Sequence, residues 1–148
     1  MKNIKQIRLI QNALTKEKEK HLIELSKLAQ SIDKKISTIS RMIVYQNEYT
    51  NTEHLRLSRS IPALTKNLYA FSEKMTDLIK QAEAEVLIMQ KSKESILQSI
   101  EKIDNKMKLM DLFEDKAKMK ALLSAEKQEQ VMMDDLASIK HTRGEEYE

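Results

Sequence analysis

The 148-residue sequence has no cysteine, no tryptophan, one glycine and one proline. Without cysteine the chain forms no disulfide and has no thiolate nucleophile. A single glycine and a single proline leave few places for tight turns, and they exclude a glycine-rich phosphate loop. No apolar run approaches the roughly 18 residues that a membrane-spanning helix needs. The basic first residues are not followed by an apolar run, so we predict no signal peptide and expect a cytoplasmic protein.

Charged residues make up 33% of the sequence and aromatic residues 4%. Lys, Glu, Leu, Ile, Gln, Ala and Met dominate the sequence, and all of these except Ile are good helix formers. This composition is typical of a coiled coil or a long helical hairpin. The net charge of +3 divides into +5 over residues 1–56 and −2 over residues 57–148. That division suits two segments that pack together, whereas a nucleic-acid-binding protein more often has one clear basic patch. We therefore predict no nucleic-acid partner.

A first helix is predicted over about residues 4–56. Between residues 22 and 43 its apolar residues alternate at spacings of three and four, which predicts a coiled-coil seam. The seam residues are then Leu22, Leu25, Ala29, Ile32, Ile36, Ile39 and Ile43. Upstream, Ile7, Ile10 and Leu14 keep the same spacing in a different phase. The charged stretch 15–21 is therefore predicted to contain a one-residue phase break.

A second, longer helix is predicted over about residues 62–141. Ser60 is a suitable N-cap, and Pro62 is tolerated in a first helical turn, so residues 57–61 are expected to form the turn of an αα-hairpin. The acidic end, residues 142–148, is expected to be disordered. The predicted fold is all-α: one domain over residues 1–148, a long antiparallel two-helix coiled coil whose second helix is the longer.

The apolar residues of the second helix fall into two rows. One row has 3-4 spacing and includes Leu68, Phe71, Met75, Leu78, Ala82, Met89, Ile96, Ile103, Met110, Phe113 and Ala117. The other contains Ile79, Val86, Ile100 and Met107. Two rows predict a buried stripe that swings from one side of the helix to the other. Because the first helix is shorter, residues from about 116 to 141 are left with an unpaired apolar stripe, which predicts a partner-binding or dimerisation surface.

No catalytic constellation is found. The histidines His21, His54 and His141 are scattered, and no pair has the spacing of four residues that a helical metal site uses. The carboxylate pairs, such as Asp134 and Asp135, have the character of a solvated helix surface. We therefore predict no enzyme, no cofactor and no metal.

Aromatic residues gather in one place, Tyr45-Gln-Asn-Glu-Tyr49. With Leu22 at heptad position a, Met42 and Tyr49 fall at g and Tyr45 falls at c. These positions lie beside the predicted seam, so the tyrosines are predicted to form an exposed contact stripe, as interface aromatics often do. Packing of the same tyrosines in the core remains the alternative.

The stretch Met42-Ile-Val-Tyr-Gln-Asn-Glu-Tyr49 resembles the FliJ family of flagellar type III export proteins. A second, looser resemblance covers residues 121–126 and 133–137, and the length and the two-helix layout also agree. The resemblance implies a stalk similar in fold to the central stalk subunit of rotary ATPases. It also implies three partners, namely the ring of the export ATPase, the cytoplasmic domain of the export gate, and export chaperones that the protein escorts. One departure is that the second helix has no aromatic residue after Phe113, where relatives can carry Trp.

The resemblance also implies where these partners bind. The gate site would consist of Met42, Tyr45, Tyr49, Phe71, Met75 and Leu78. The ATPase site would use the helical termini, including Leu122, Leu123, Met133 and Leu136. The expected location is the cytoplasm at the inner-membrane flagellar base, with membrane contact only through partners.

Three other functions remain open. The chain could be the stalk protein of a non-flagellar type III secretion system. It could instead be a purely structural coiled coil that dimerises. It could also be an adaptor that binds nucleic acid or membrane through its basic first helix.

Overall fold

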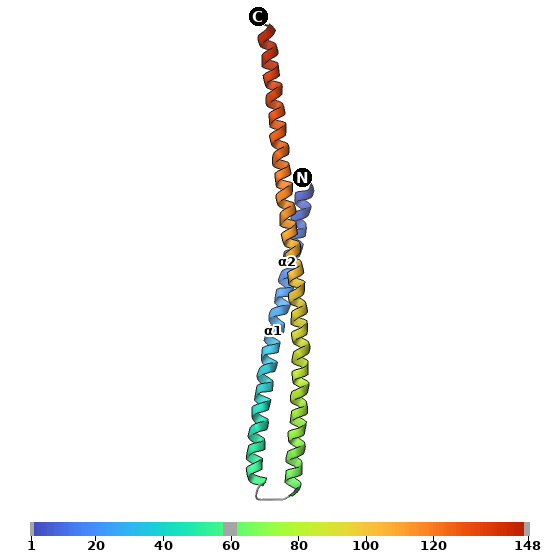
Figure 1. Cartoon of the computed structure of the whole chain (residues 1–148), viewed down its shortest axis with the longest axis vertical. Helices are drawn as coiled ribbons and strands as arrows, with labels where there is room; N and C mark the ends of the chain where they lie inside the picture. The colour runs from blue at the N-terminus through green and yellow to red at the C-terminus, as the bar shows by residue number, and fades with distance from the viewer. Residues whose placement is uncertain (1, 58–61, 147–148) are drawn as a thin grey trace. The chain divides into compact units, whose positions relative to one another are not determined.

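The computed structural model describes the backbone of residues 2–57 and 62–146 and the side chains of residues 4–51 and 66–142. It contains two helices, α1 (Lys2–Leu57) and α2 (Pro62–Glu146) (Figure 1). No strand is present in these residues. The predicted all-α hairpin with a longer second helix is thus confirmed.

Both helices extend slightly past their predicted ends. Helix α1 begins two residues earlier, and α2 continues to Glu146, through five residues of the acidic end that was predicted to be disordered. Gly144 does not end α2, because one glycine costs a helix only about 1 kcal/mol relative to alanine. No described residue has a positive φ that would mark a glycine cap. The turn was predicted at residues 57–61, but Leu57 is the last residue of α1; residues 58–61, with Ser60, lie outside the described residues, as do residues 147–148.

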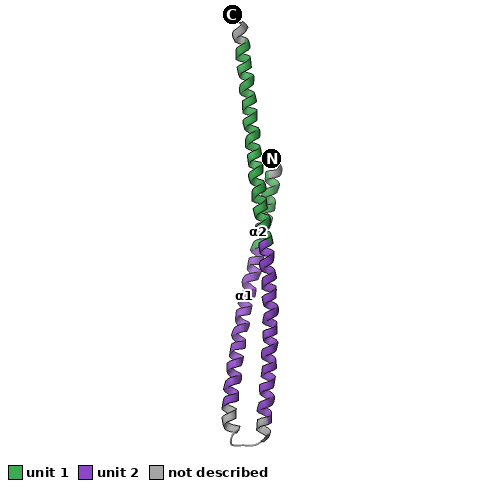
Figure 2. Cartoon of the chain, viewed as in Figure 1, with its two compact units in different colours: residues 1–18, 102–148 green, residues 19–101 purple. Residues whose placement is uncertain are grey.

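The chain divides into two compact units (Figure 2). Unit 1 contains residues 1–18 and 102–148, and unit 2 contains residues 19–101. In each unit a segment of α1 packs antiparallel to a segment of α2. In unit 1, Gln11 contacts Glu114 while Lys18 contacts Asp104. In unit 2, Lys35 contacts Glu85 while Gln46 contacts Thr76.

Most of the less exposed residues of α1 follow one unbroken 3-4 spacing. The seam residues are Ile4, Ile7, Gln11, Leu14, Lys18, His21, Leu25, Leu28, Ile32, Lys35, Ile39, Met42, Gln46 and Tyr49, and two further half-buried residues, Ala29 (predicted for the seam) and Thr50, lie beside it. The phase break predicted at residues 15–21 is therefore wrong. Lys18 and His21 occupy the two seam positions in that stretch, and because neither residue is apolar, the apolar pattern did not identify these positions. Long polar side chains can fill such positions because their stems pack while their charged ends reach solvent or a partner.

Helix α2 also has a single seam, so the predicted swing of its buried stripe is wrong. The seam residues are Leu68, Ser72, Met75, Ile79, Ala82, Val86, Met89, Lys93, Ile96, Ile100, Ile103, Met107, Met110, Glu114, Ala117 and Ala121. The two predicted rows are alternate halves of this one seam, with polar residues at 72, 93 and 114. Three residues of the first predicted row lie beside the seam: Phe71, which is half-buried, and Leu78 and Phe113, which are 43% and 42% exposed.

The predicted register of α1 was right in one half of the seam and wrong in the other. Leu25, Ile32 and Ile39 lie in the seam as predicted. Leu22, Ile36 and Ile43 are instead 44%, 44% and 38% exposed. The residue before each of them takes the seam position. The prediction selected these three residues because they form a third apolar column on α1, beside the two columns of the seam. An apolar face of this width is typical of helices that face more than one neighbour.

The best-packed part of unit 2 is a cluster of four buried residues, Ile32, Ile39, Ile79 and Val86, with Leu28, Met42, Ala82 and Met89 against it. In unit 1, Leu14 and Ile103 are buried. None of the described side chains is completely enclosed. Stability therefore comes from many moderately buried seam residues, each worth roughly 1.5–3 kcal/mol at full burial.

Candidate partner-binding surfaces

The aromatic residues of unit 2 form one cluster across the two helices. Tyr49 is half-buried in the seam, and its ring centroid lies 4.3 Å from that of Phe71 on α2. Tyr45 is 56% exposed, and its centroid lies 6.4 Å from those of both Tyr49 and Phe71. Such offset and edge-on pairs contribute about 0.5–1.5 kcal/mol beyond area burial. The tyrosines therefore have different environments, because Tyr49 packs between the helices and Tyr45 covers the cluster from solvent.

The six residues predicted to bind an export gate do not form one exposed stripe. Met42 and Met75 lie in the seam, and Met42 packs against the core cluster of unit 2. Tyr49 and Phe71 are half-buried. Tyr45 and Leu78 are exposed. Of the six residues, only Tyr45 and Leu78 are therefore exposed, and the other four are partly buried between the helices.

Gln46 fixes the alignment of the helices beside this cluster. Its Nε2 donates to the backbone carbonyl of Ser72 at 2.9 Å and to Oγ1 of Thr76 at 2.8 Å. Thr76 in turn donates to the same carbonyl at 2.9 Å. The prediction from the sequence assigned no function to Gln46. The available signal was a polar residue at a seam position in a heptad series that otherwise favours apolar residues, a device that often specifies register.

Unit 1 has a corresponding polar layer around Glu114. The Glu114 carboxylate lies 2.9 Å from Lys118 Nζ, accepts a 2.7 Å hydrogen bond from Gln11, and lies 4.0 Å from Arg8 Nε. The hydrogen bond from Lys118, followed by that from Gln11, lowers the pKa of Glu114 below its usual value of 4.5. Gln11 also donates to Asp111 at 2.9 Å, and Lys18 pairs with Asp104 at 2.7 Å. These contacts fix which residues of unit 1 face each other.

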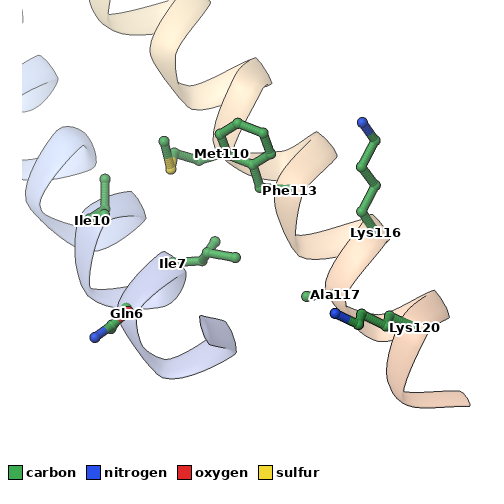
Figure 3. Close-up of a pocket in the computed structure, with 8 residues that line it drawn as sticks. All are labelled: Gln6, Ile7, Ile10, Met110, Phe113, Lys116, Ala117 and Lys120. Atoms are coloured by element: carbon green, nitrogen blue, oxygen red, sulfur yellow. The ribbon is translucent and has the colours of Figure 1, made fainter. Parts of the chain in front are cut away.

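A shallow hollow lies between the two helices of unit 1, with a volume of about 380 Å³ (Figure 3). Figure 3 shows the Ile7 side chain extending from α1 toward α2 and the Met110 side chain extending from α2 toward α1. Phe113 and Ile10 line it from the side and are 42% and 45% exposed. Gln6, Lys116, Ala117 and Lys120 complete the described lining, which therefore combines apolar side chains with two lysines.

Most of the large apolar side chains of unit 1 that are more than half exposed lie at the end of α2. Every described side chain from residue 122 to residue 142 is exposed. Seven large apolar residues among them are more than half exposed: Leu122, Leu123, Val131, Met132, Met133, Leu136 and Ile139. The four residues predicted for an ATPase contact, Leu122, Leu123, Met133 and Leu136, all belong to this set. We call residues 122–142 the α2 extension.

The described residues contain no group of three or more metal-ligating side chains. Nor does any helix in the described part of the chain have a stretch long and apolar enough to cross a membrane. His21 lies in unit 2 and His141 in unit 1, while the His54 side chain is outside the described residues.

No family model, curated protein or solved structure matches the chain.

Proposed function

We propose that the chain is a non-enzymatic central-stalk and adaptor protein of the flagellar type III protein export apparatus. In this role it binds the export ATPase ring and the export gate and escorts export chaperones. The observation that carries the proposal is the α2 extension, a helical segment with seven large apolar side chains that are more than half exposed.

The extension favours a partner on energetic grounds. Helices outside a tertiary structure are marginal in water, because most helix stability in proteins comes from packing of an apolar face. Soluble monomers rarely leave a large continuous apolar surface open to solvent. A helix that enters an ATPase ring would bury this surface. The same contact would explain why α2 is so much longer than α1.

The aromatic cluster supports a second contact, with the export gate. Tyr45 and Leu78 are exposed beside the packed pair of Tyr49 and Phe71. Rigid aromatic side chains held by their neighbours lose little entropy on binding and are frequent energetic centres of interfaces. The cluster lies in unit 2 and the α2 extension in unit 1, so the two proposed contacts use separate surfaces.

The ATPase contact is tested with two leucines of equal exposure. Leu136 in the extension and Leu112 outside it are both 57% exposed. We expect Leu136→Lys to abolish stimulation of ring assembly and ATP hydrolysis by the cognate export ATPase, and Leu112→Lys to leave it unchanged. Equal effects of the two variants would contradict the proposed contact.

Two alternatives use the same surfaces. The chain would act as the stalk of a non-flagellar type III secretion system if it stimulates the ATPase of that system and not the flagellar one. A purely structural, dimeric coiled coil would bury the α2 extension against a second copy. Sedimentation equilibrium distinguishes this case, because Leu136→Lys would then convert a dimer into a monomer.

A further inference from the structure

The two edges of unit 2 differ in charge and in apolar content. The observed seam gives a new heptad lettering, with Ile39 and Val86 at position a and Met42 and Met89 at position d. Positions e and b of both helices then lie on one edge, and positions g and c lie on the other. Contacts confirm this assignment, since Tyr45 and Phe71, both at g, have centroids 6.4 Å apart. Ile36 and Glu83, both at e, line a common groove.

One of these edges is acidic. Over residues 19–51 and 66–101, its e and b positions hold six carboxylates and two lysines. The carboxylates are Glu19, Asp33, Glu73, Glu83, Glu94 and Glu101. The g and c positions over the same residues hold five basic residues and three carboxylates, one of which, Glu85, is paired with Lys35. We call the first edge the acidic edge.

The acidic edge also carries the third apolar column of α1. Leu22, Ile36 and Ile43 lie along it and are 38–44% exposed. From α2, Leu87 and Leu97 are 60% and 47% exposed. Ile36 and Leu87 line a groove of about 370 Å³ between the helices, together with Glu83 and the core residues Ile39 and Val86. The edge therefore combines an apolar groove with carboxylates on its rim.

We propose that the acidic edge of unit 2 is a docking groove for a basic amphipathic helix of a partner protein, which would complete a three-helix coiled coil. An apolar stripe that is three columns wide is typical of a helix with two helical neighbours, and α1 has one such neighbour, α2. Leucine or isoleucine side chains of the docked helix fill the groove. Its lysines or arginines lie against the carboxylates of the rim, which selects a basic helix over an acidic one. This site goes beyond the proposed function, since it lies on the opposite edge from Tyr45 and in a different unit from the α2 extension.

Fluorescence anisotropy tests the proposal with the full chain and two labelled helical peptides. Both peptides have leucine and isoleucine at a and d, and they differ only in having lysine or glutamate at the flanking e and g positions. We expect the lysine peptide to bind at least about tenfold more tightly than the glutamate peptide, with an affinity that falls as salt rises.

Neighbouring exposed residues provide matched variants. Leu87 lies on the acidic edge and is 60% exposed, whereas Ile88 lies on the opposite edge and is 65% exposed. Leu87→Lys should weaken binding of the lysine peptide at least about tenfold, and Ile88→Lys should change it by less than about twofold, as surface substitutions usually do. Glu83→Lys should weaken it as Leu87→Lys does. Circular dichroism of each variant verifies that helix content is unchanged.

Three results would overturn the proposal. The lysine peptide could fail to bind at all, the two peptides could bind equally well, or Leu87→Lys and Ile88→Lys could have equal effects. A fourth result would reassign the groove. If sedimentation shows that the wild type is a dimer and that Leu87→Lys is a monomer, the occupant is a second copy of the chain. None of these measurements uses the export ATPase, so their failure is independent of the proposed function.

Discussion

Replacement of Tyr49 and of Tyr45 by alanine should have different consequences, although the two residues belong to one motif. Tyr49 is half-buried in the seam, with its centroid 4.3 Å from that of Phe71. Truncation of a fully buried large aromatic residue costs about 3–5 kcal/mol. At half burial, and with loss of the aromatic pair, we expect Tyr49→Ala to lower the free energy of unfolding by about 2 kcal/mol. Tyr45 is 56% exposed, so Tyr45→Ala should cost less than about 1 kcal/mol.

Urea denaturation followed by circular dichroism at 222 nm measures both values. A lower midpoint at an unchanged slope identifies a change in stability. Equal losses for the two variants would refute the observed register, which places one tyrosine in the seam and the other outside it. Tyr45→Ala is also the cleaner test of the proposed gate contact, because a loss of binding without a loss of stability assigns the effect to the interface.

Three further predictions concern the polar residues of the seam. Gln46→Ala should lower the free energy of unfolding by about 1–3 kcal/mol, because a partly buried hydrogen-bonded layer is lost. The exposed control Gln30→Ala should change it by less than about 0.5 kcal/mol. Chemical denaturation measures both values, and equal effects would contradict a role of Gln46 in aligning the helices. The lowered pKa of Glu114 means that its contribution is complete above the unfolded-state value of 4.5 and is lost as pH falls through the lower folded-state value. Thermal denaturation between pH 6 and pH 3 should therefore show a smaller acid-induced loss in Glu114→Gln than in the wild type, and identical pH profiles would show that the contact with Lys118 does not affect stability. Lys35→Leu should keep or raise the free energy of unfolding, because it removes a half-exposed ion pair worth at most about 1 kcal/mol and adds apolar surface to the seam. A large decrease of this free energy in urea denaturation would show that the pair with Glu85 is essential for stability.

The sequence predicted the helices but only half of their contact surface. Composition and the single break near Pro62 were enough for two helices of unequal length. In each helix one set of seam positions was also identified, including Ile32, Ile39 and Ile103, since residues of this set are apolar over residues 25–39 of α1 and residues 68–117 of α2. The other set contains His21 and Lys35 on α1. A search for apolar residues passes over these two positions, as it passes over Lys18 and Gln46 in the first set.

The errors have a common physical cause. Where a seam position is polar and its neighbour is apolar, apolar periodicity alone selects the neighbour, as it did with Ile36 in place of Lys35. Only the facing helix decides between them, because Glu85 lies where it can pair with Lys35. The same shift of one residue placed Met42 and Tyr49 beside the seam when they lie in it. The α2 extension was predicted more successfully, because it depends only on the difference in length between the helices.

Hydrogen exchange of the full chain, with and without the cognate export ATPase, is the most direct test of the proposed stalk function. Residues 122–142 belong to α2, and the side chains of this segment are all exposed. Its backbone amides should therefore exchange readily in the free chain, as do those of helices with few packed contacts. We predict strong protection of this segment when the ATPase is added, and no such protection with Leu136→Lys. Unchanged exchange of residues 122–142 in the presence of the ATPase would contradict the proposal that the α2 extension enters the ring.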